Sequence, residues 1–415
     1  MKTLYFAAIA ILAACSSPQS SEIKSATEAP RLPTGARLDP AGRLTDVGAL
    51  PLALVASPDN KRIVLLLNGY RDQGVQILDR ATGEVTQTLV QPAAFIGLVF
   101  SPDGKKLYAS GGNEDVVYVY DWANGSATVS DTLVLALKKK NSWGTKYPAG
   151  IGISPNGKTL YAAENVSDSL AVVDIASGRV TQRLATERYP YGVVVANDGT
   201  VYVSAWGGNT VSVFKPSAQG SLEDSGRITV GRHPSSLLLN RDGSRLFTTS
   251  ATTDRVIVVD THRRTVIARL DDAVTSGPGE GSTPNALALS PDETRLYVAE
   301  GDNNAVGIFE LSAKTSGVPT AKGNDALSGR IPSGWYPSAL AVTSDSLFVA
   351  NAKGRGTGPN VDGPSPGKGR GNARNYTLGQ ISGTVMTMPL PQPAQLSQYS
   401  ARVARANGWD SKTKP

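Results

Sequence analysis

The sequence predicts an all-β protein, a seven-bladed β-propeller closed by an N-terminal strand that pairs with the last blade. A turn motif of the Ser-Pro-Asp-Gly type, degenerate in some copies, occurs seven times in the 415 residues. Its third positions are residues 59, 103, 156, 198, 242, 292 and 345, so neighbouring copies lie 42 to 53 residues apart. Repeats of about 40–50 residues are typical of propeller blades. Stacked helical repeats have similar periods, but no copy here has the apolar stripe of a helix.

Each copy predicts a set of short antiparallel strands. In the second copy, Pro102 presets the φ angle of the turn, Asp103 tolerates the next position and Gly104 takes a positive φ. Apolar residues 96–100 precede this turn and residues 106–109 follow it, which makes the two runs antiparallel neighbours. A third run follows a polar loop at 116–120, and the next copy shows a fourth run at 180–184. Four such strands make one blade.

The last copy lacks one strand. Residues 338–342, 347–350 and 383–388 supply three strands, and no fourth run follows them. Residues 42–48 form a spare strand before the first copy. We expect this strand to pair with the last blade, because a closed ring leaves no open seam between the first and last blades.

The N-terminal residues predict the compartment. Residues 1–14 are interpreted as a lipoprotein signal peptide, since a short basic start precedes eleven apolar residues and a membrane span needs about 20. Leu12-Ala13-Ala14-Cys15 resembles the lipobox of bacterial lipoproteins, which implies that Cys15 carries lipid and anchors the chain to a membrane. The alternative is an ordinary cleavage site that a cysteine happens to follow. Because Ser16 and not Asp comes next, the resemblance implies an outer-membrane location, on the periplasmic side or the surface.

The remaining chain divides into three parts. Residues 15–37 are rich in Ser, Pro, Ala and charge, which is typical of a flexible tether. The propeller is expected at 38–390, with a basic Gly- and Pro-rich insert at 353–380 in its last blade. Residues 391–415 are expected to form a short helix and a tail, with Leu396, Tyr399 and Val403 on one face.

Two resemblances follow from short motifs. Leu-Tyr-Val-Ala-Glu at 296–300, Leu-Phe-Val-Ala-Asn at 347–351 and Val-Tyr-Val-Ser-Ala at 201–205 resemble the YVTN-type seven-bladed propellers of bacterial surface proteins. Segments 334–339, 350–356 and 395–399 resemble the end of the propeller half of propeller–phosphoesterase fusions. The Asp/His metal-ligand set of those phosphoesterases does not occur in these 415 residues. This resemblance therefore implies, at most, a separately encoded phosphoesterase as a partner.

Composition narrows the chemistry. One cysteine and two histidines in 415 residues exclude a thiolate metal cluster, a disulfide scaffold and a copper or haem centre that needs several imidazoles. We expect no metal and no cofactor. A net charge of +6 is modest for a nucleic-acid-binding protein, so nucleic acid is not the expected partner.

The candidate site lies in two kinds of loop. In a propeller, the loops before the innermost strands and those between second and third strands share one face, where sites are usual. These loops hold aromatic, amide and charged side chains typical of binding surfaces: Arg71, Asn113, Glu114, Tyr147, Asn165, Tyr189, Tyr191, Trp206, Arg255, Asp302, Trp335, Tyr336, Asn351 and Lys353. The alternative is that the aromatic residues before proline only pack between blades.

Catalysis has one candidate base. His233 is the only histidine expected in a loop at the mouth, with Glu164 or Glu300 as the acid partner. We expect first a membrane-anchored extracytoplasmic scaffold that binds an envelope protein or a small ligand at the mouth and has no catalysis of its own. The alternatives are a hydrolase of the propeller-lactonase kind and an accessory subunit of a phosphoesterase.

Overall fold

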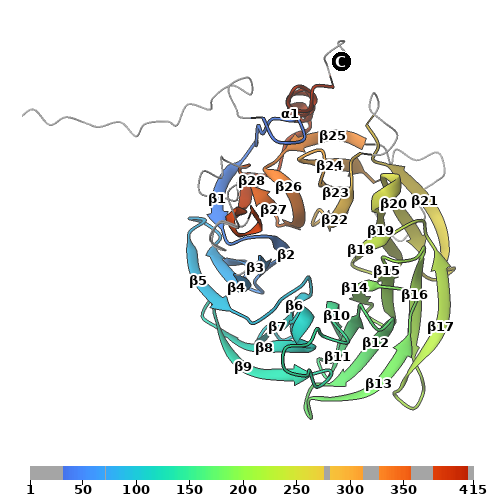
Figure 1. Cartoon of the computed structure of the whole chain (residues 1–415). Helices are drawn as coiled ribbons and strands as arrows, with labels where there is room; N and C mark the ends of the chain where they lie inside the picture. Colours follow the sequence, from blue (N-terminus) through green and yellow to red (C-terminus); the bar gives the residue numbers. More distant parts are fainter. Residues whose placement is uncertain (1–30, 71, 275–280, 312–326, 357–376, 410–415) are drawn as a thin grey trace, which may run out of the picture.

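A computed structural model describes residues 31–70, 72–274, 281–311, 327–356 and 377–409. Seven four-stranded antiparallel sheets stand around a central axis (Figure 1), which confirms the predicted propeller. Within each sheet the strands run in order from the axis outward.

The blades follow the chain, and their strands are listed here from the inside outward. Blade 1 holds β2 (Pro51–Ala56), β3 (Arg62–Asn68), β4 (Gln73–Asp79) and β5 (Val85–Val90). Blade 2 holds β6 (Leu98–Phe100), β7 (Lys106–Ser110), β8 (Val116–Ala123) and β9 (Ser126–Val134). Blade 3 holds β10 (Pro148–Ile153), β11 (Thr159–Glu164), β12 (Ser169–Asp174) and β13 (Arg179–Ala185). Blade 4 holds β14 (Pro190–Val195), β15 (Val201–Ala205), β16 (Thr210–Pro216) and β17 (Leu222–Thr229).

The second half continues in the same way. Blade 5 holds β18 (Pro234–Leu239), β19 (Arg245–Ser250), β20 (Arg255–Asp260) and β21 (Thr265–Asp271). Blade 6 holds β22 (Pro284–Leu289), β23 (Arg295–Glu300), β24 (Ala305–Glu310) and β25 (Leu327–Pro332). Blade 7 holds β26 (Trp335–Val342), β27 (Ser346–Gly354), β28 (Gly383–Pro389) and β1 (Arg43–Val47). The helical elements are η1 (Gly112–Glu114), η2 (Ala251–Thr253), η4 (Thr377–Gln380) and α1 (Pro393–Asn407).

The ring closes as predicted. Strand β1 pairs antiparallel with β28, from Arg43 opposite Thr387 to Val47 opposite Gly383. The outermost strand of blade 7 therefore comes from the N-terminal side of the chain and its three inner strands from the C-terminal side. This pairing joins the two ends of the fold by backbone hydrogen bonds.

The recurring turns are held by a side-chain bracket. The Ser101 hydroxyl donates to the Asp103 carboxylate at 2.6 Å and accepts from the Lys106 backbone N–H at 2.9 Å. The Ser101 hydrogen bond is the main reason why the pKa of Asp103 lies below its ordinary value. The same bracket forms at Ser57/Asp59, Ser154/Asn156 and Ser290/Asp292. Each bracket joins residues that lie close together in the sequence, which explains why the turns could be predicted from the sequence.

The core is a ring of seven apolar clusters, one between each pair of neighbouring blades. The cluster between blades 1 and 2, for example, joins Val64 and Ile77 to Leu107 and the fully buried Tyr120. Outer strands add amide pairs: the Gln87 side chain both donates to and accepts from the backbone of Ala127 in the next blade. Each blade is thus stabilised by burial against both neighbours, which makes the channel wall rigid.

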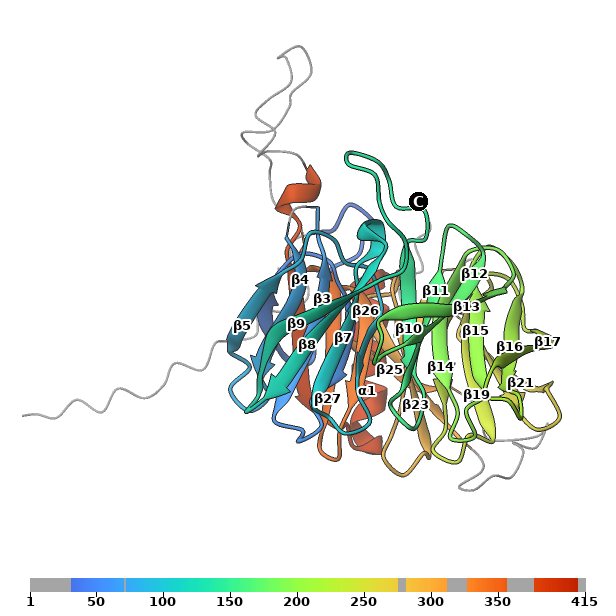
Figure 2. The ribbon, with the colours of Figure 1, turned by 90° about the horizontal axis from the view of Figure 1, so that it is seen from below.

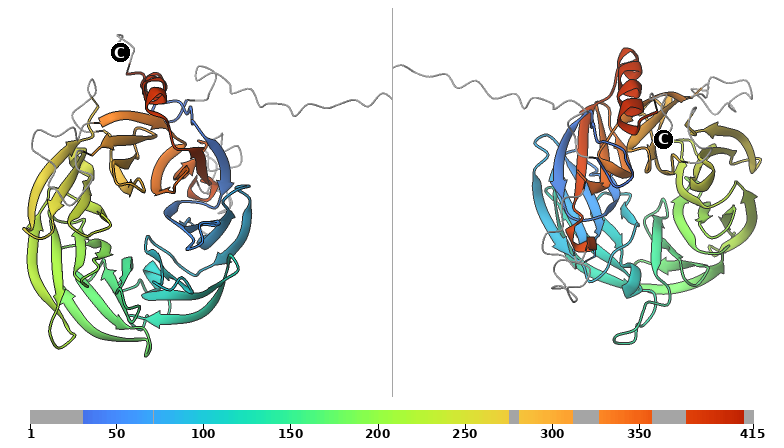
Figure 3. Two further views of the ribbon diagram at one scale, coloured as in Figure 1. Left: turned by 180° about the vertical axis from the view of Figure 1, so that it is seen from behind. Right: turned by 45° about the horizontal axis from the view of Figure 1, so that its top comes forward.

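The first and the last described segments pack together on blades 6 and 7. Helix α1 lies outside the ring beside β25 (Figures 1 and 3). Its Leu396 and Val403 are buried. The Arg402 guanidinium binds both the carboxylate and the backbone carbonyl of Asp39. None of the helices in the described ranges combines the length and the apolar character that a membrane crossing requires.

The segment interpreted as a tether is packed over its last residues. Leu32 and Ala36 are buried in a small cluster with Trp335, and the Arg37 N–H donates to the carbonyl of Ala406. This packing differs from the prediction of a flexible tether over the whole of residues 15–37. The reason is that Leu32 and Ala36 are buried against a surface that forms only in the folded protein. Of the basic insert at 353–380, residues 357–376 lie outside the described residues.

Candidate functional site at the mouth of the channel

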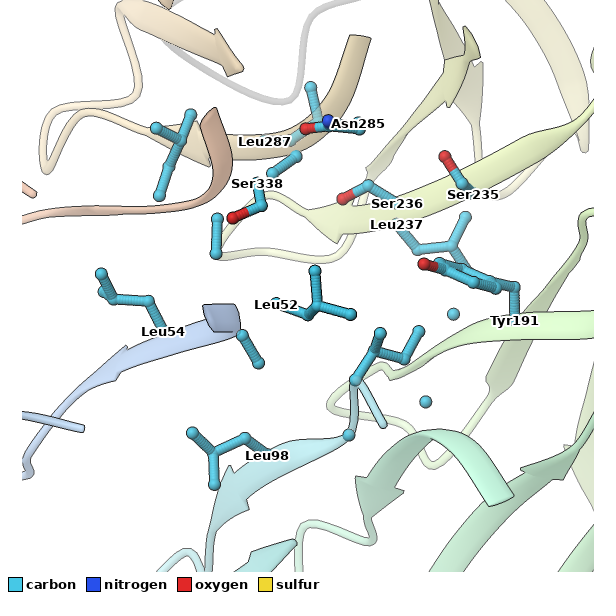
Figure 4. A pocket seen from close by; sticks show the side chains of 18 of the residues that line it. Leu52, Leu54, Leu98, Tyr191, Ser235, Ser236, Leu237, Asn285, Leu287 and Ser338 are labelled. Atoms are coloured by element: carbon cyan, nitrogen blue, oxygen red, sulfur yellow. The ribbon is translucent and has the colours of Figure 1, made fainter. Parts of the chain in front are cut away.

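The seven innermost strands enclose a cavity of about 370 Å³ on the axis. Leucines from several strands form much of its wall, among them Leu52, Leu98 and Leu237. Figure 4 shows that the polar residues around this space come from different blades. The polar side chains are Tyr191, Ser235, Ser236, Asn285, Tyr336 and Ser338. A cavity with apolar walls and a few convergent hydroxyl and amide groups is the usual form of a small-molecule site.

The two channel tyrosines carry neutral phenols. Burial raises the pKa of Tyr191 to about 12, with a smaller contribution from the charge of Tyr336. Burial also raises the pKa of Tyr336, and the nearby Asp302 carboxylate adds to the increase. Near neutral pH both phenols therefore keep their protons and can donate hydrogen bonds to a ligand in the channel.

The mouth of the channel is built from residues in an unusual backbone conformation. In six blades the residue before the first proline of the innermost strand has a φ between 49° and 61°. These residues are Leu50, Tyr147, Tyr189, His233, Thr283 and Tyr336. A left-handed φ is uncommon for bulky or β-branched side chains and costs free energy, so the fold must hold it in place.

Carboxylate and amide oxygens of the preceding blade hold this conformation. Asp115 accepts the backbone N–H of Tyr147 at 2.8 Å, and Asp168 accepts that of Tyr189 at 2.8 Å. Asp254 and Asn304 do the same, each at 3.0 Å, for Thr283 and Tyr336. Four of the mouth residues are therefore fixed by side chains of the loop between the second and third strands of the blade before them. In His233 the backbone N–H instead donates to the carbonyl of Gly208, in the corresponding loop of blade 4, at 3.1 Å. We call the face that carries both kinds of loop the mouth face.

Aromatic rings and cations lie together on the mouth face. The Trp206 ring stacks on His233, with ring centres 5.1 Å apart and an angle of 19° between planes. Trp206 is 46% exposed, and the buried Nδ1 of His233 has no hydrogen-bond partner. The Arg188 guanidinium lies 5.5 Å from the centre of the Tyr189 ring, and the Lys353 ammonium 4.3 Å from that of Tyr336. Such groups can bind a ligand that has both a flat face and negative charge.

The two proposed acid partners do not fit a catalytic role. Glu164 has no exposed surface and is bound through both oxygens by the Arg183 guanidinium, at 3.1 and 3.0 Å. Glu300 is equally buried and is bound through both oxygens by Arg330, at 2.9 and 2.8 Å. Each carboxylate sits between strands of its own blade, where it holds that blade together. Neither is placed to pass a proton to or from a ligand beside His233.

Other predicted residues serve the fold around the site. Trp335 is buried under the N-terminal segment and also contacts Lys353, and Asn351 is fully buried in blade 7. Asn113 accepts the Gly144 N–H, Glu114 pairs with Lys138, Asn165 donates to the carbonyl of Pro190, and Asp302 accepts the Thr283 hydroxyl. Arg255 is exposed at the start of β20. Arg71 lies outside the described residues.

Sequence reasoning missed part of the site. Ser235, Ser236, Asn285 and Ser338 line the channel, and Phe95 packs edge-on against Tyr147 and Tyr191 at 5.3 and 5.8 Å. The serines and Asn285 each follow the proline of an innermost strand within two residues, and this spacing could have revealed them. Within the described ranges, no group of three His, Cys, Asp or Glu side chains is arranged to hold a metal ion.

Comparisons with known proteins agree on the propeller. A family model described as the SMP-30/Gluconolactonase/LRE-like region matches residues 139–252. A 6-phosphogluconolactonase of Enterobacter sp. (strain 638) is 25% identical over 159 residues, which are 37% of this chain and 48% of that protein. The chain thus spans about half the length of this curated relative.

Solved structures show the same fold at low identity. The hydrazine synthase of Kuenenia stuttgartiensis superposes with a TM-score of 0.60 and 21% identity, over 74% of this chain and 93% of the other. Virginiamycin B lyase from Staphylococcus aureus gives 0.56 and 12%, over 83% and 99%. The chain shares its propeller architecture with these proteins. At such identities the likeness concerns the fold alone.

Proposed function

We propose that the protein is a binding module that takes a small anionic sugar derivative, such as a sugar acid or a phosphorylated sugar lactone, at the mouth of its channel. The observation that carries the proposal is the set of strained residues before proline, which several blades hold around one opening. Left-handed φ angles at Tyr189, His233 and Tyr336 are held by neighbouring blades although they cost free energy. Arg188 and Lys353 supply positive charge beside the aromatic rings.

Calorimetric titration with phosphorylated and unphosphorylated gluconate tests this proposal. The variant Trp206→Ala removes the exposed ring on His233 and should weaken binding at least tenfold, about 1.4 kcal/mol. Val166→Ala is a matched control, because Val166 is a 48% exposed residue on the same face whose aliphatic side chain has no ring to stack on His233. Equal affinities of the two variants, or the absence of any heat with the original protein, would contradict the proposal.

A second candidate is hydrolysis of a sugar lactone. The match to the gluconolactonase-like family model covers residues 139–252, which include His233 and Trp206. The imidazole of His233, which is only partly buried, is the group at the mouth best suited to accept a proton from water. With gluconolactone as substrate, His233→Asn should abolish turnover, whereas His262→Asn, which changes the other and exposed histidine, should leave it unchanged. Unchanged turnover in His233→Asn would exclude this role.

We also propose that Cys15 is acylated and anchors the chain in the cell envelope. The support is the lipobox-like Leu12-Ala13-Ala14-Cys15 after an apolar run too short to span a bilayer. Mass spectrometry of the protein from detergent-solubilised membranes should show diacylglycerol on an N-terminal Cys15. The variant Cys15→Ser should lose that mass and move to the soluble fraction, and an unmodified original protein in the soluble fraction would contradict the anchor.

A further inference from the structure

One loop on the mouth face exposes large apolar side chains to solvent. Leu137 and Trp143, in the connection between β9 and β10, are 92% and 81% exposed. Figure 2 shows this connection rising well above the ring. Among the described residues, seven of the eleven large apolar side chains that are exposed lie on the mouth face: Tyr70, Leu137, Trp143, Val166, Tyr189, Trp206 and Leu378. Exposed apolar side chains that cluster on one face are typical of an interaction surface.

The loop is held firmly at its base. Asp115 accepts the backbone N–H groups of Thr145 and Lys146 at 2.6 and 2.9 Å. The Lys138 ammonium pairs with the Glu114 carboxylate, and Asn113 accepts the Gly144 N–H. Because both sides of the loop are anchored to η1, the exposure of Trp143 is a property of the fold and not of a frayed segment.

The charge of the loop is one-sided. Residues 135–147 contain four lysines and no aspartate or glutamate. Lys138 is paired with Glu114, whereas Lys139 and Lys140 are exposed beside Leu137. Lysines next to an exposed leucine and tryptophan match the chemistry of an anionic lipid surface, where ammonium groups meet phosphates and an indole ring enters the interface.

We propose that this loop inserts into the interface of an anionic lipid membrane and turns the mouth face toward it. The position of the first described residues supports this orientation. Leu32 packs on Trp335, and the Lys353 ammonium contacts the rings of both Trp335 and the mouth residue Tyr336. Fifteen residues lie between Cys15 and Arg31, and the sixteen residue-to-residue steps reach at most about 55 Å. If Cys15 is acylated, as proposed above, the anchor and the loop therefore reach the same bilayer.

Vesicle co-sedimentation tests the loop without the anchor. The chain from Ser16 onward retains every described element and lacks Cys15, so a failure of the acylation proposal does not affect the result. It should bind vesicles of phosphatidylglycerol and phosphatidylcholine at least tenfold more tightly than pure phosphatidylcholine. Leu137→Ser with Trp143→Ser, and separately Lys139→Glu with Lys140→Glu, should each weaken binding at least tenfold.

Matched controls change the same chemistry elsewhere. Val90→Ser with Val129→Ser alters exposed apolar residues of outer strands, and Lys105→Glu with Lys158→Glu alters exposed lysines of the turns on the opposite face. These variants should bind vesicles like the original protein. Brominated lipid should quench the fluorescence of the original protein more than that of Trp143→Phe. Equal binding of loop and control variants, equal binding to neutral vesicles, or no vesicle binding at all would overturn the proposal.

Discussion

Asp272 is a buried acid without a cation of its own, and replacing it with asparagine should change how the stability of the fold depends on pH. The residue follows β21 and has no exposed surface, and neither of its carboxylate oxygens has a hydrogen-bond partner. The single guanidinium nearby, from Arg330, binds both oxygens of Glu300 and only the backbone carbonyl of Asp272. In blade 3 the corresponding arginine, Arg183, binds the carbonyl of Leu135, so a neutral residue occupies the equivalent position there.

The direction and size of the effect follow from burial. Burial raises the pKa of Asp272 well above 3.8, and the charge of Glu300 raises it further, against the opposing effect of Arg330. Between the unfolded value, near 3.9, and this raised pKa, the folded protein holds a proton that the unfolded chain has released. The free energy of unfolding therefore falls as pH rises through this window, by up to about 1.4 kcal/mol per pH unit. Below the unfolded value the contribution is constant.

Urea unfolding at a series of pH values from 5 to 8 measures this slope. The Asp272→Asn variant lacks the titrating proton. Its free energy of unfolding, relative to that of the original protein, should therefore increase by about 1.4 kcal/mol for each unit by which the pH is raised, until the pKa of Asp272 in the folded protein is passed. Asp103→Asn is the control: the pKa of Asp103 is lowered by Ser101, so this change should shift stability without altering the slope above pH 5. An unchanged slope in Asp272→Asn would refute the reasoning that Asp272 is folded in its protonated form.

Three further changes test the packing that holds the site. Arg183→Met leaves the fully buried Glu164 without its cation and should cost about 3 kcal/mol in urea unfolding, whereas Arg295→Met, at a partly exposed pair with Glu310, should cost under about 1 kcal/mol. Asp115→Ala removes the acceptor of three consecutive backbone N–H groups and should cost about 3 kcal/mol, with faster proteolysis of the β9–β10 loop as a second readout. Leu396→Ala should lower the free energy of unfolding by about 2–4 kcal/mol. If it lowers this free energy by less than an alanine substitution at an exposed position of the helix, then α1 does not stabilise the ring.

The architecture was predictable because its signals are local. The Ser-Asp brackets join residues two to five positions apart, so each blade carries its own turn in the sequence. The spare strand near the N-terminus and the missing strand of the last blade predicted the pairing of β1 with β28. The amphipathic spacing of Leu396 and Val403 likewise predicted the buried face of α1.

The site was predictable only in part. The mouth residues before proline were identified because a proline stands at or near the start of six of the seven innermost strands. Their left-handed backbone was not, because it depends on Asp115, Asp168 and Asn304, which come from the blade before. The channel serines were missed although they follow the same prolines within two residues, because which positions of an innermost strand face the axis is clear only once the seven strands have met.

The number of blades, the order of the strands and the loops that share the mouth face can be predicted from the residues alone. The role of the ionisable side chains becomes clear only in the folded protein, because charge pairing depends on residues that meet from distant strands. Glu164 and Glu300 were candidate acids in the sequence analysis. In the folded protein Arg183, 19 residues away, binds Glu164, and Arg330, 30 residues away, binds Glu300. Burial likewise raised the pKa of Asp272, an ordinary aspartate in the sequence, well above its usual value.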